Sequence, residues 1–248
     1  ARELVLGTAA YHGRMLILNR HCAAESTGHG SPLPHLVHGG PGRAGGGEEM
    51  GGVRGVLHYM QRTALQGTPE TLTNIGHRWI RGSEQKDPGV HPFRKTFEQL
   101  ELGDTFVSES RTVTLDDIEH FANFTGDHFY AHMVEEDARR NPFFEGRVAH
   151  GYLIVSFAAG LFVDPDFGPV LANYGVDDLR FLQPLNAGDS LTVRLACKQK
   201  TLRGDTGYGE VRWDAEVTNE DGEIVAQYDV LTMVATNEHW NSVRNETT

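Results

Sequence analysis

The 248-residue sequence contains only two cysteines, Cys22 and Cys197, which lie far apart. Such a pair forms neither a disulfide framework nor a four-ligand zinc motif, and it favours a reducing, cytoplasmic location. Basic residues are also few, because 22 Lys and Arg stand against 34 Asp and Glu and leave a net charge of -12. A field of that sign repels nucleic acid. We therefore expect no nucleic-acid partner.

A long hydrophobic run is missing as well. The longest uncharged stretch around an apolar core spans residues 148–163 and includes His150, whereas a membrane-spanning helix needs roughly 20 apolar residues. We expect a buried helix there and no membrane partner. No signal peptide precedes the first motif and the sequence opens on Ala1, so we expect a fragment or a processed product.

Two patterns in the N-terminal third predict no binding site. Residues 40–45 match the dinucleotide-binding pattern G-x-G-x-x-G, but the strand and helix that give this pattern its meaning are missing around it. His29, His35 and His38 lack the spacing of a metal motif, and no local feature activates Cys22 as a nucleophile. We expect a glycine-rich loop, no metal and no cofactor-binding residue in this segment.

The composition changes twice along the chain. Residues 1–68 include a Gly-, His- and Pro-rich stretch that is poorly suited to forming a core. Residues 69–92 are polar and punctuated by Gly and Pro, which predicts a linker with a short helix over 72–79. The second unit is expected over 93–236, followed by a polar tail over 237–248.

Helix signals open the second unit. Thr114 and Asp117 have the spacing of a capping box, and Gly126 predicts the end of the helix that they start. A second amphipathic helix is expected over 134–140. Residues 151–162 are apolar nearly all round, which predicts a fully buried helix.

Strand signals close the unit. Apolar residues alternate with polar or small ones over 191–198 and again over 211–217, and Asp221-Gly222 marks a turn before an apolar strand at 224–235. The economical arrangement is an α+β fold in which an antiparallel sheet wraps around the buried helix.

The sharpest functional signal is the pair Asp127 and His132, five residues apart just past a predicted helix end. A carboxylate and an imidazole on one turn can perform general acid–base chemistry on water. Taken alone, a turn-capping Asp and a surface His are the more common interpretation. The second element is Gly151 at the head of the buried helix, where free backbone N–H groups face developing negative charge. An acid, a base and an oxyanion donor are then all present.

These residues resemble a known motif. Thr125-Gly126-Asp127 through His132, followed by Val148-Ala149-His150-Gly151, resembles the motif of the MaoC-like R-specific enoyl-CoA hydratases, with Phe129-Tyr130-Ala131 where that family has Asn-Pro and one further residue. The resemblance implies a hot-dog fold and an acyl-CoA substrate. It also implies that Asp127 takes a proton from water, that His132 orients the water and helps to protonate the α-carbon, and that the Gly151 N–H polarises the thioester oxygen. Neither a metal nor a redox cofactor is implied.

A narrower resemblance covers nearly the whole chain. Residues 146–152 and 168–175 are similar to the C-terminal oxepin-CoA hydrolase domain of the bifunctional phenylacetate-degradation proteins, and residues 25–34 and 39–52 are similar to the end of their aldehyde dehydrogenase half. The resemblance implies that 1–68 is a dehydrogenase remnant and that the catalytic Cys, the general-base Glu and the NADP site lie upstream of Ala1. We therefore expect no aldehyde oxidation by this chain. The resemblance also implies a homodimer as the minimal unit, with CoA at the junction.

Two alternatives stay open. One is a general R-specific hydratase of straight-chain enoyl-CoA, which the motif does not separate from the ring-opening enzyme. The other is a non-catalytic domain that binds acyl-CoA or mediates oligomerisation, although such a module would need neither Asp127 nor His132. Lys198, Lys200 and Arg203 are candidates for contacts with the CoA phosphates, but charges at a strand end more often form a solvated face.

Overall fold

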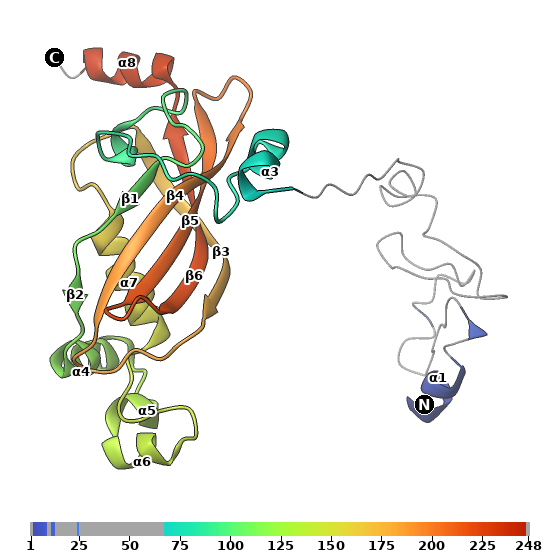
Figure 1. Ribbon diagram of the computed structural model, residues 1–248, viewed down its shortest axis with the longest axis vertical. Coiled ribbons are helices and arrows are strands. Elements are labelled where there is room, and N and C mark those ends of the chain that lie inside the picture. Colours follow the sequence, from blue (N-terminus) through green and yellow to red (C-terminus); the bar gives the residue numbers. More distant parts are fainter. Residues whose placement is uncertain (1, 9–10, 13–23, 25–66, 247–248) are drawn as a thin grey trace. The chain divides into compact units, whose positions relative to one another are not determined.

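The computed structural model describes residues 2–8, 11–12, 24 and 67–246, and the chain divides into two units, Ala1–Leu65 and Gln66–Thr248 (Figure 1). The first unit contributes helix α1 (Arg2–Thr8). Most of the predicted remnant at 1–68 lies outside the described residues, and so do Cys22, the glycine-rich motif at 40–45 and the three histidines before it.

A single antiparallel sheet in the second unit wraps around helix α7 (Gly151–Phe162) (Figure 1). The strand order is β1-β4-β5-β6-β3, and β2 also pairs with β4. The predicted α+β arrangement is confirmed. Its strands are β1 (Thr105–Val107), β2 (Arg111–Thr112), β3 (Val170–Phe181), β4 (Ser190–Leu202), β5 (Tyr208–Asn219) and β6 (Ile224–Ala235).

Helices α4 to α6 gather at one end of the sheet (Figure 1). The Thr114 side chain accepts a hydrogen bond from the Asp117 N–H, and the Asp117 carboxylate accepts one from the Thr114 N–H, so the predicted capping box is confirmed. Gly126 ends this helix with a φ of 83°, a left-handed conformation that glycine adopts without strain. The helices are α3 (Pro69–Gly76), η4 (Pro92–Arg94), α4 (Leu115–Thr125), α5 (Tyr130–Met133), α6 (Glu135–Arg140) and α8 (Asn237–Glu246).

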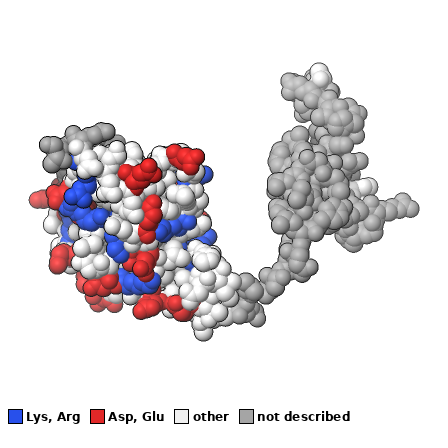
Figure 2. Space-filling view, turned by 90° about the horizontal axis from the view of Figure 1, so that it is seen from above, with Lys and Arg blue, Asp and Glu red and all other residues white. Residues whose placement is uncertain are grey.

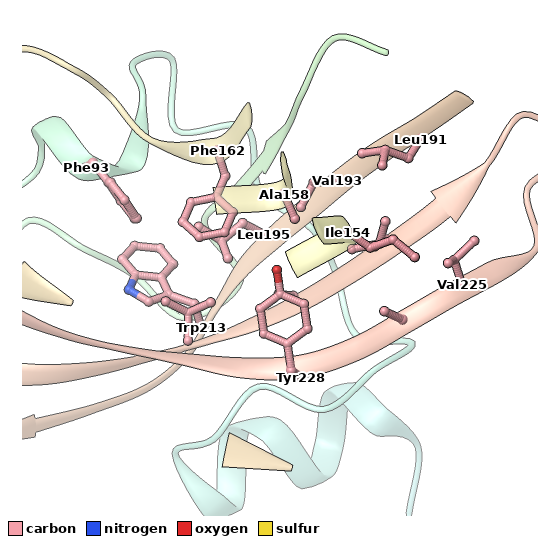
Figure 3. Packing of buried hydrophobic residues seen from close by; sticks show 14 of the residues in the cluster. Phe93, Ile154, Ala158, Phe162, Leu191, Val193, Leu195, Trp213, Val225 and Tyr228 are labelled. Atoms are coloured by element: carbon pink, nitrogen blue, oxygen red, sulfur yellow. The ribbon is translucent and has the colours of Figure 1, made fainter. Parts of the chain in front are cut away.

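The core lies between α7 and the concave face of the sheet (Figure 3). The predicted alternation is confirmed, because these apolar residues of β4 and β5 are fully buried: Leu191, Val193, Leu195, Cys197, Val211, Trp213, Ala215 and Val217. Each large aliphatic or aromatic side chain buried in this way contributes roughly 1.5–3 kcal/mol. Residues from α7 complete the cluster, namely Leu153, Ile154, Ala158 and Phe162.

The prediction that α7 is buried on all sides is wrong for one face. Tyr152 and Ser156, four residues apart, are exposed, and the Tyr152 side chain is 69% accessible. The sheet covers the opposite side of the helix, so a residue on this stripe gains nothing from it. No helix among the described residues has both the length and the apolar character to cross a membrane.

The segment predicted as a linker packs against the sheet. Trp79 is 2% exposed and its backbone N–H donates to the carbonyl of Lys198, while Arg81 pairs with the buried Asp214 on β5 at 3.0 Å. The short helix expected over 72–79 lies at Pro69–Gly76 instead, because Thr68 caps it and Pro69 occupies its first turn. The predicted polar tail forms helix α8.

Candidate active site

The loop after α4 brings the predicted acid–base pair together. Gly126 turns the chain, Asp127 follows, and the short helix α5 presents His132. The Asp127 carboxylate and a ring nitrogen each of His132 and His150 all lie within 4.8 Å of one another. Asp127 and His132 thus meet at one point, as their spacing predicts.

The ring of His132 is oriented by the backbone. Its Nδ1 lies 2.7 Å from the carbonyl oxygen of Val148, and because a carbonyl only accepts, Nδ1 must carry the proton. The Val148 N–H in turn donates to the carbonyl of Ala131. The lone pair of the neutral ring is therefore on Nε2, and this nitrogen can accept a hydrogen bond from water or substrate in the site.

Burial lowers the pKa of His132 below its ordinary value of 6.5. The hydrogen bond to Val148 and the charge of Asp127 act in the opposite direction, and His150 lowers this pKa further. Because burial is the largest of these effects, the imidazole is neutral near pH 7. It can then accept a proton or a hydrogen bond from water.

His150 joins the site although the sequence motif does not assign it a role. It is 1% exposed, and its ring stacks on that of His132 with the centroids 3.8 Å apart and the planes at 28°. Its Nε2 lies 2.9 Å from the carbonyl oxygen of Asp127. Its position directly before Gly151 in the second motif was the signal that could have identified it.

Arg147 is a second residue that sequence reasoning leaves without a role. Its Nε donates to the carbonyl of His132 at 2.7 Å, and its guanidinium pairs with Glu119 of α4 at 2.9 Å. The segment before α7 is thereby tied to α4 and α5. Its signal was its place directly before the second motif, next to Val148.

Gly151 begins α7, and no side-chain hydrogen bond from its N-cap residue His150 covers the helix N-terminus. The first backbone N–H groups of such a helix point outward along a positive dipole end. A Cβ at position 151 would lie 2.5 Å from the Cζ of Phe181. Glycine leaves room here for the ring of Phe181, the last residue of β3, which a larger residue would displace.

These groups line one groove. Its volume is about 570 Å³, within the roughly 300–1,000 Å³ of small-molecule sites. Asp127, His132 and Gly151 supply its convergent polar groups. The remainder is mostly apolar or aromatic, namely Phe143, Phe144, Val148, Ala149, Tyr152, Ile154, Phe181, Leu182, Gln183, Pro184 and Leu185.

The geometry favours acid–base chemistry over metal binding at this cluster. Metal ligands direct their lone pairs at one centre. The two imidazoles are stacked with their planes at 28°, and each already directs one ring nitrogen at a backbone carbonyl. A carboxylate next to a neutral imidazole in an apolar groove can instead share the protons of one water molecule.

The three basic residues considered as contacts for the CoA phosphates already have partners within the protein. Lys198 pairs with Asp229, Lys200 donates to the carbonyl of Leu100, and Arg203 pairs with Glu210, each at 2.6 Å. These three cations already have partners, which agrees with the more common interpretation. Figure 2 shows basic and acidic side chains interspersed over one face.

Burial also decides the chemistry of Cys197. It raises the pKa of the Cys197 thiol to about 12, and the side chain is fully enclosed in the core. A thiol in such surroundings is a small apolar side chain and not a nucleophile.

The fold and the groove together define a class. An antiparallel sheet around one central helix is the hot-dog fold, which is also found in solved structures similar to this chain. Residues 98–219 match the family model described as the MaoC like domain. The chain therefore carries a MaoC-like dehydratase domain.

Particular relatives agree with this class. The chain is 57% identical over 203 residues to Protein MaoC from Klebsiella aerogenes, an alignment that covers 82% of this chain and 60% of that protein. The chain thus spans about three fifths of the length of the curated relatives it matches.

Two solved structures are similar to part of this chain. A monoamine oxidase regulatory protein from Archaeoglobus fulgidus is 30% identical with a TM-score of 0.54, and the match covers 58% of this chain and 95% of that one. A MaoC-like dehydratase from Rhodospirillum rubrum is 25% identical with a TM-score of 0.52, and the match covers 58% of this chain and 98% of that one.

Proposed function

We propose that this domain adds water across the conjugated double bond of an enoyl-CoA thioester. The observation that carries the proposal is the meeting of Asp127 and His132 at an apolar groove that begins at the free N-terminus of α7. A relative named as a dehydratase supports it, because hydration and dehydration are one reaction run in opposite directions.

The proposed reaction begins with one water molecule held between the Asp127 carboxylate and Nε2 of His132. Asp127 takes a proton from the water while the water oxygen bonds to the β-carbon. The electron pair of the double bond moves through the α-carbon to the thioester oxygen. The enolate oxygen that forms is stabilised by the Gly151 N–H.

The carbonyl then returns. The electron pair of the enolate bonds the α-carbon to the proton that the Asp127–His132 pair has taken up, and the pair is ready for another turnover. The atoms of one water are added, with H at the α-carbon and OH at the β-carbon, and no electrons are gained or lost. A neutral His132 suits this cycle because it accepts a hydrogen bond from the water and passes on the proton.

The finer proposal is ring-opening hydration of oxepin-CoA. In that substrate the β-carbon also carries the ring oxygen, so adding water gives a hemiketal that collapses to an open-chain aldehyde. The proposal rests on the resemblance to the bifunctional phenylacetate-degradation proteins, and the aromatic side chains of Phe143, Phe144 and Phe181 around the groove suit an apolar ring. The general straight-chain hydratase stays the alternative activity.

The proposed partner is a second copy of this chain. Strand β3 lies at the edge of the sheet and is twelve residues long, and Leu171, Tyr174 and Val176 on it are 42–45% exposed. A long, apolar edge strand is a template for pairing with another chain. Phe181 at its end lines the groove, so edge pairing would place the partner beside the substrate.

The proposal also covers the parts of the protein beyond the domain. We infer an aldehyde dehydrogenase domain upstream, of which residues 1–68 are the end, and a cytoplasmic location. The competing proposal is a domain that binds acyl-CoA or mediates oligomerisation without chemistry. The proximity of Asp127 and His132 favours the enzyme, because binding alone needs neither group.

One assay tests the activity and the substrate class together. The protein is incubated with crotonyl-CoA and with oxepin-CoA, and the loss of the conjugated thioester absorbance is followed. We expect turnover of both, with a higher kcat/KM for oxepin-CoA. Turnover of crotonyl-CoA alone would contradict the ring-opening proposal, and binding of both without turnover would favour the non-catalytic module. Asp127→Asn is the matched inactive control.

A further inference from the structure

His150 contacts both members of the acid–base pair by different means. It touches Asp127 through a hydrogen bond, from Nε2 to the backbone carbonyl at 2.9 Å. It touches His132 through ring stacking with the centroids 3.8 Å apart. The two contacts come from one residue on the segment before α7, whereas Asp127 lies in the loop after α4 and His132 lies on the short helix α5.

Burying the imidazole of His150 at this position costs free energy of folding. Because its Nε2 faces a carbonyl, Nε2 carries the proton and Nδ1 carries the lone pair. That Nδ1 is buried and has no hydrogen-bond partner among the described residues. The ring of Phe121 packs against the His150 ring, with the two centroids 5.0 Å apart. Leaving a buried acceptor unpaired costs free energy that an apolar residue would avoid, so a benefit elsewhere must offset it.

His150 lies outside the groove that would hold the substrate. It is 1% exposed and does not line the groove, whereas Asp127 and His132 do. Its one proton is engaged by the Asp127 carbonyl. Because His150 does not line the groove, its position favours a role through these two neighbours over proton transfer with the substrate.

We propose that His150 is a positioning residue that locks Asp127 and His132 into one geometry, the hydrogen bond fixing the backbone at Asp127 and the stacked ring fixing the rotamer of His132. The inference rests on the proposed hydration. Catalysis of this kind depends on placement, since an error of about 1 Å can cost about 100-fold in rate. The unpaired Nδ1 is then the consequence of a ring that must both donate from Nε2 and stack.

Two substitutions separate the two contacts. His150→Gln keeps an amide donor for the Asp127 carbonyl and removes the stacked ring. His150→Phe keeps the stacked ring and removes the donor, together with the unpaired Nδ1. His128→Gln is the matched control, because His128 is an exposed histidine of the same loop whose ring faces only the Gly126 carbonyl and the Asn123 side chain.

The measurements are kcat and KM for crotonyl-CoA and the NMR titration of the His132 ring in the free protein. We expect each His150 variant to lose about 10- to 100-fold in kcat with KM changed by less than about threefold. We also expect the pKa of His132 to rise in both variants, because the groups facing its ring are Asp127 and His150 and the neighbour that lowers it is removed. His128→Gln should change neither quantity.

The outcomes are separable. Wild-type kcat in both His150 variants, or the same loss of kcat in His128→Gln, would overturn the proposal. A kcat loss that follows the loss of folded protein in thermal unfolding, with the His132 titration unmoved, would also overturn it and leave a purely structural residue. If the wild-type protein fails to hydrate any thioester, the proposed function fails, while the titration still decides whether His150 controls His132.

Discussion

The contact between Gly151 and Phe181 offers a quantitative test of how the groove is built. An alanine Cβ at position 151 would lie 2.5 to 2.9 Å from three ring atoms of Phe181, far inside van der Waals contact, so the ring must leave. Burying a Phe completely contributes roughly 1.5–3 kcal/mol. Phe181 is 46% exposed, so its contact is worth about half of that. We expect Gly151→Ala to lower the free energy of unfolding by about 1 kcal/mol, since Gly151 is the first residue of α7 and gains little from the helix propensity of Ala, which applies to helix interiors.

A double-mutant cycle isolates this contact. Phe181→Ala removes the same ring, so adding it to Gly151→Ala should cost almost nothing more, and the coupling energy should be about 1 kcal/mol. Urea unfolding followed by circular dichroism measures all four proteins. Gly160→Ala is the control on the same helix, because a Cβ there meets nothing within 4 Å and should stabilise the protein by about 0.5–1 kcal/mol. Additive effects of Gly151→Ala and Phe181→Ala would refute the contact.

Three further predictions concern the chemistry and the assembly. Asp127→Asn should reduce the rate of hydration by about 100-fold or more with stability nearly unchanged, since an exposed base on a loop becomes an amide of the same shape. Near-native turnover in the absorbance assay would exclude Asp127 as the base. The pKa of His132 in the folded protein is lowered, so the unfolded chain binds the proton first as pH falls. Hydration and the contribution of His132 to stability should both be complete above pH 6.5 and decline below it. His132→Gln should remove this pH dependence from the free energy of unfolding. Light scattering should find a dimer that Val176→Lys on the β3 edge dissociates, while Val107→Lys on the opposite edge strand does not; a fully active monomer would contradict the proposed dimer.

The helices and central strands could be predicted because their signals are local. The capping box of Thr114 and Asp117 and the glycine stop at Gly126 are satisfied within a single helix, so they do not depend on the rest of the fold. The alternation along β4 and β5 is nearly as direct, since both strands have one face on the core. Their pairing follows from the short turns between them.

Strand β3 and the packed segment before the domain could not be predicted in this way. Strand β3 has almost no buried face in the described chain, so the two-residue period that reveals a strand is weak, and a register shift between Asp177 and Arg180 interrupts it further. The segment at 69–92 reads as a linker because it is polar. Its attachment depends on single residues, Trp79 and Arg81, whose partners on β4 and β5 are more than 100 residues away.

The residues of the site also fall into two groups, those that the sequence predicts and those that only tertiary contacts reveal. Asp127 and His132 could be paired from sequence because they lie only five residues apart. Gly151 could be placed because the start of a helix is signalled locally. The Phe181 ring that packs on Gly151 and the His150 ring that stacks on His132 depend on tertiary contacts between α7, β3 and α5. A spacing rule finds groups that can act together, but it contains no information on what holds them still. The residues that hold them must therefore be sought where an otherwise costly side chain is buried against the motif, as the unpaired imidazole of His150 is.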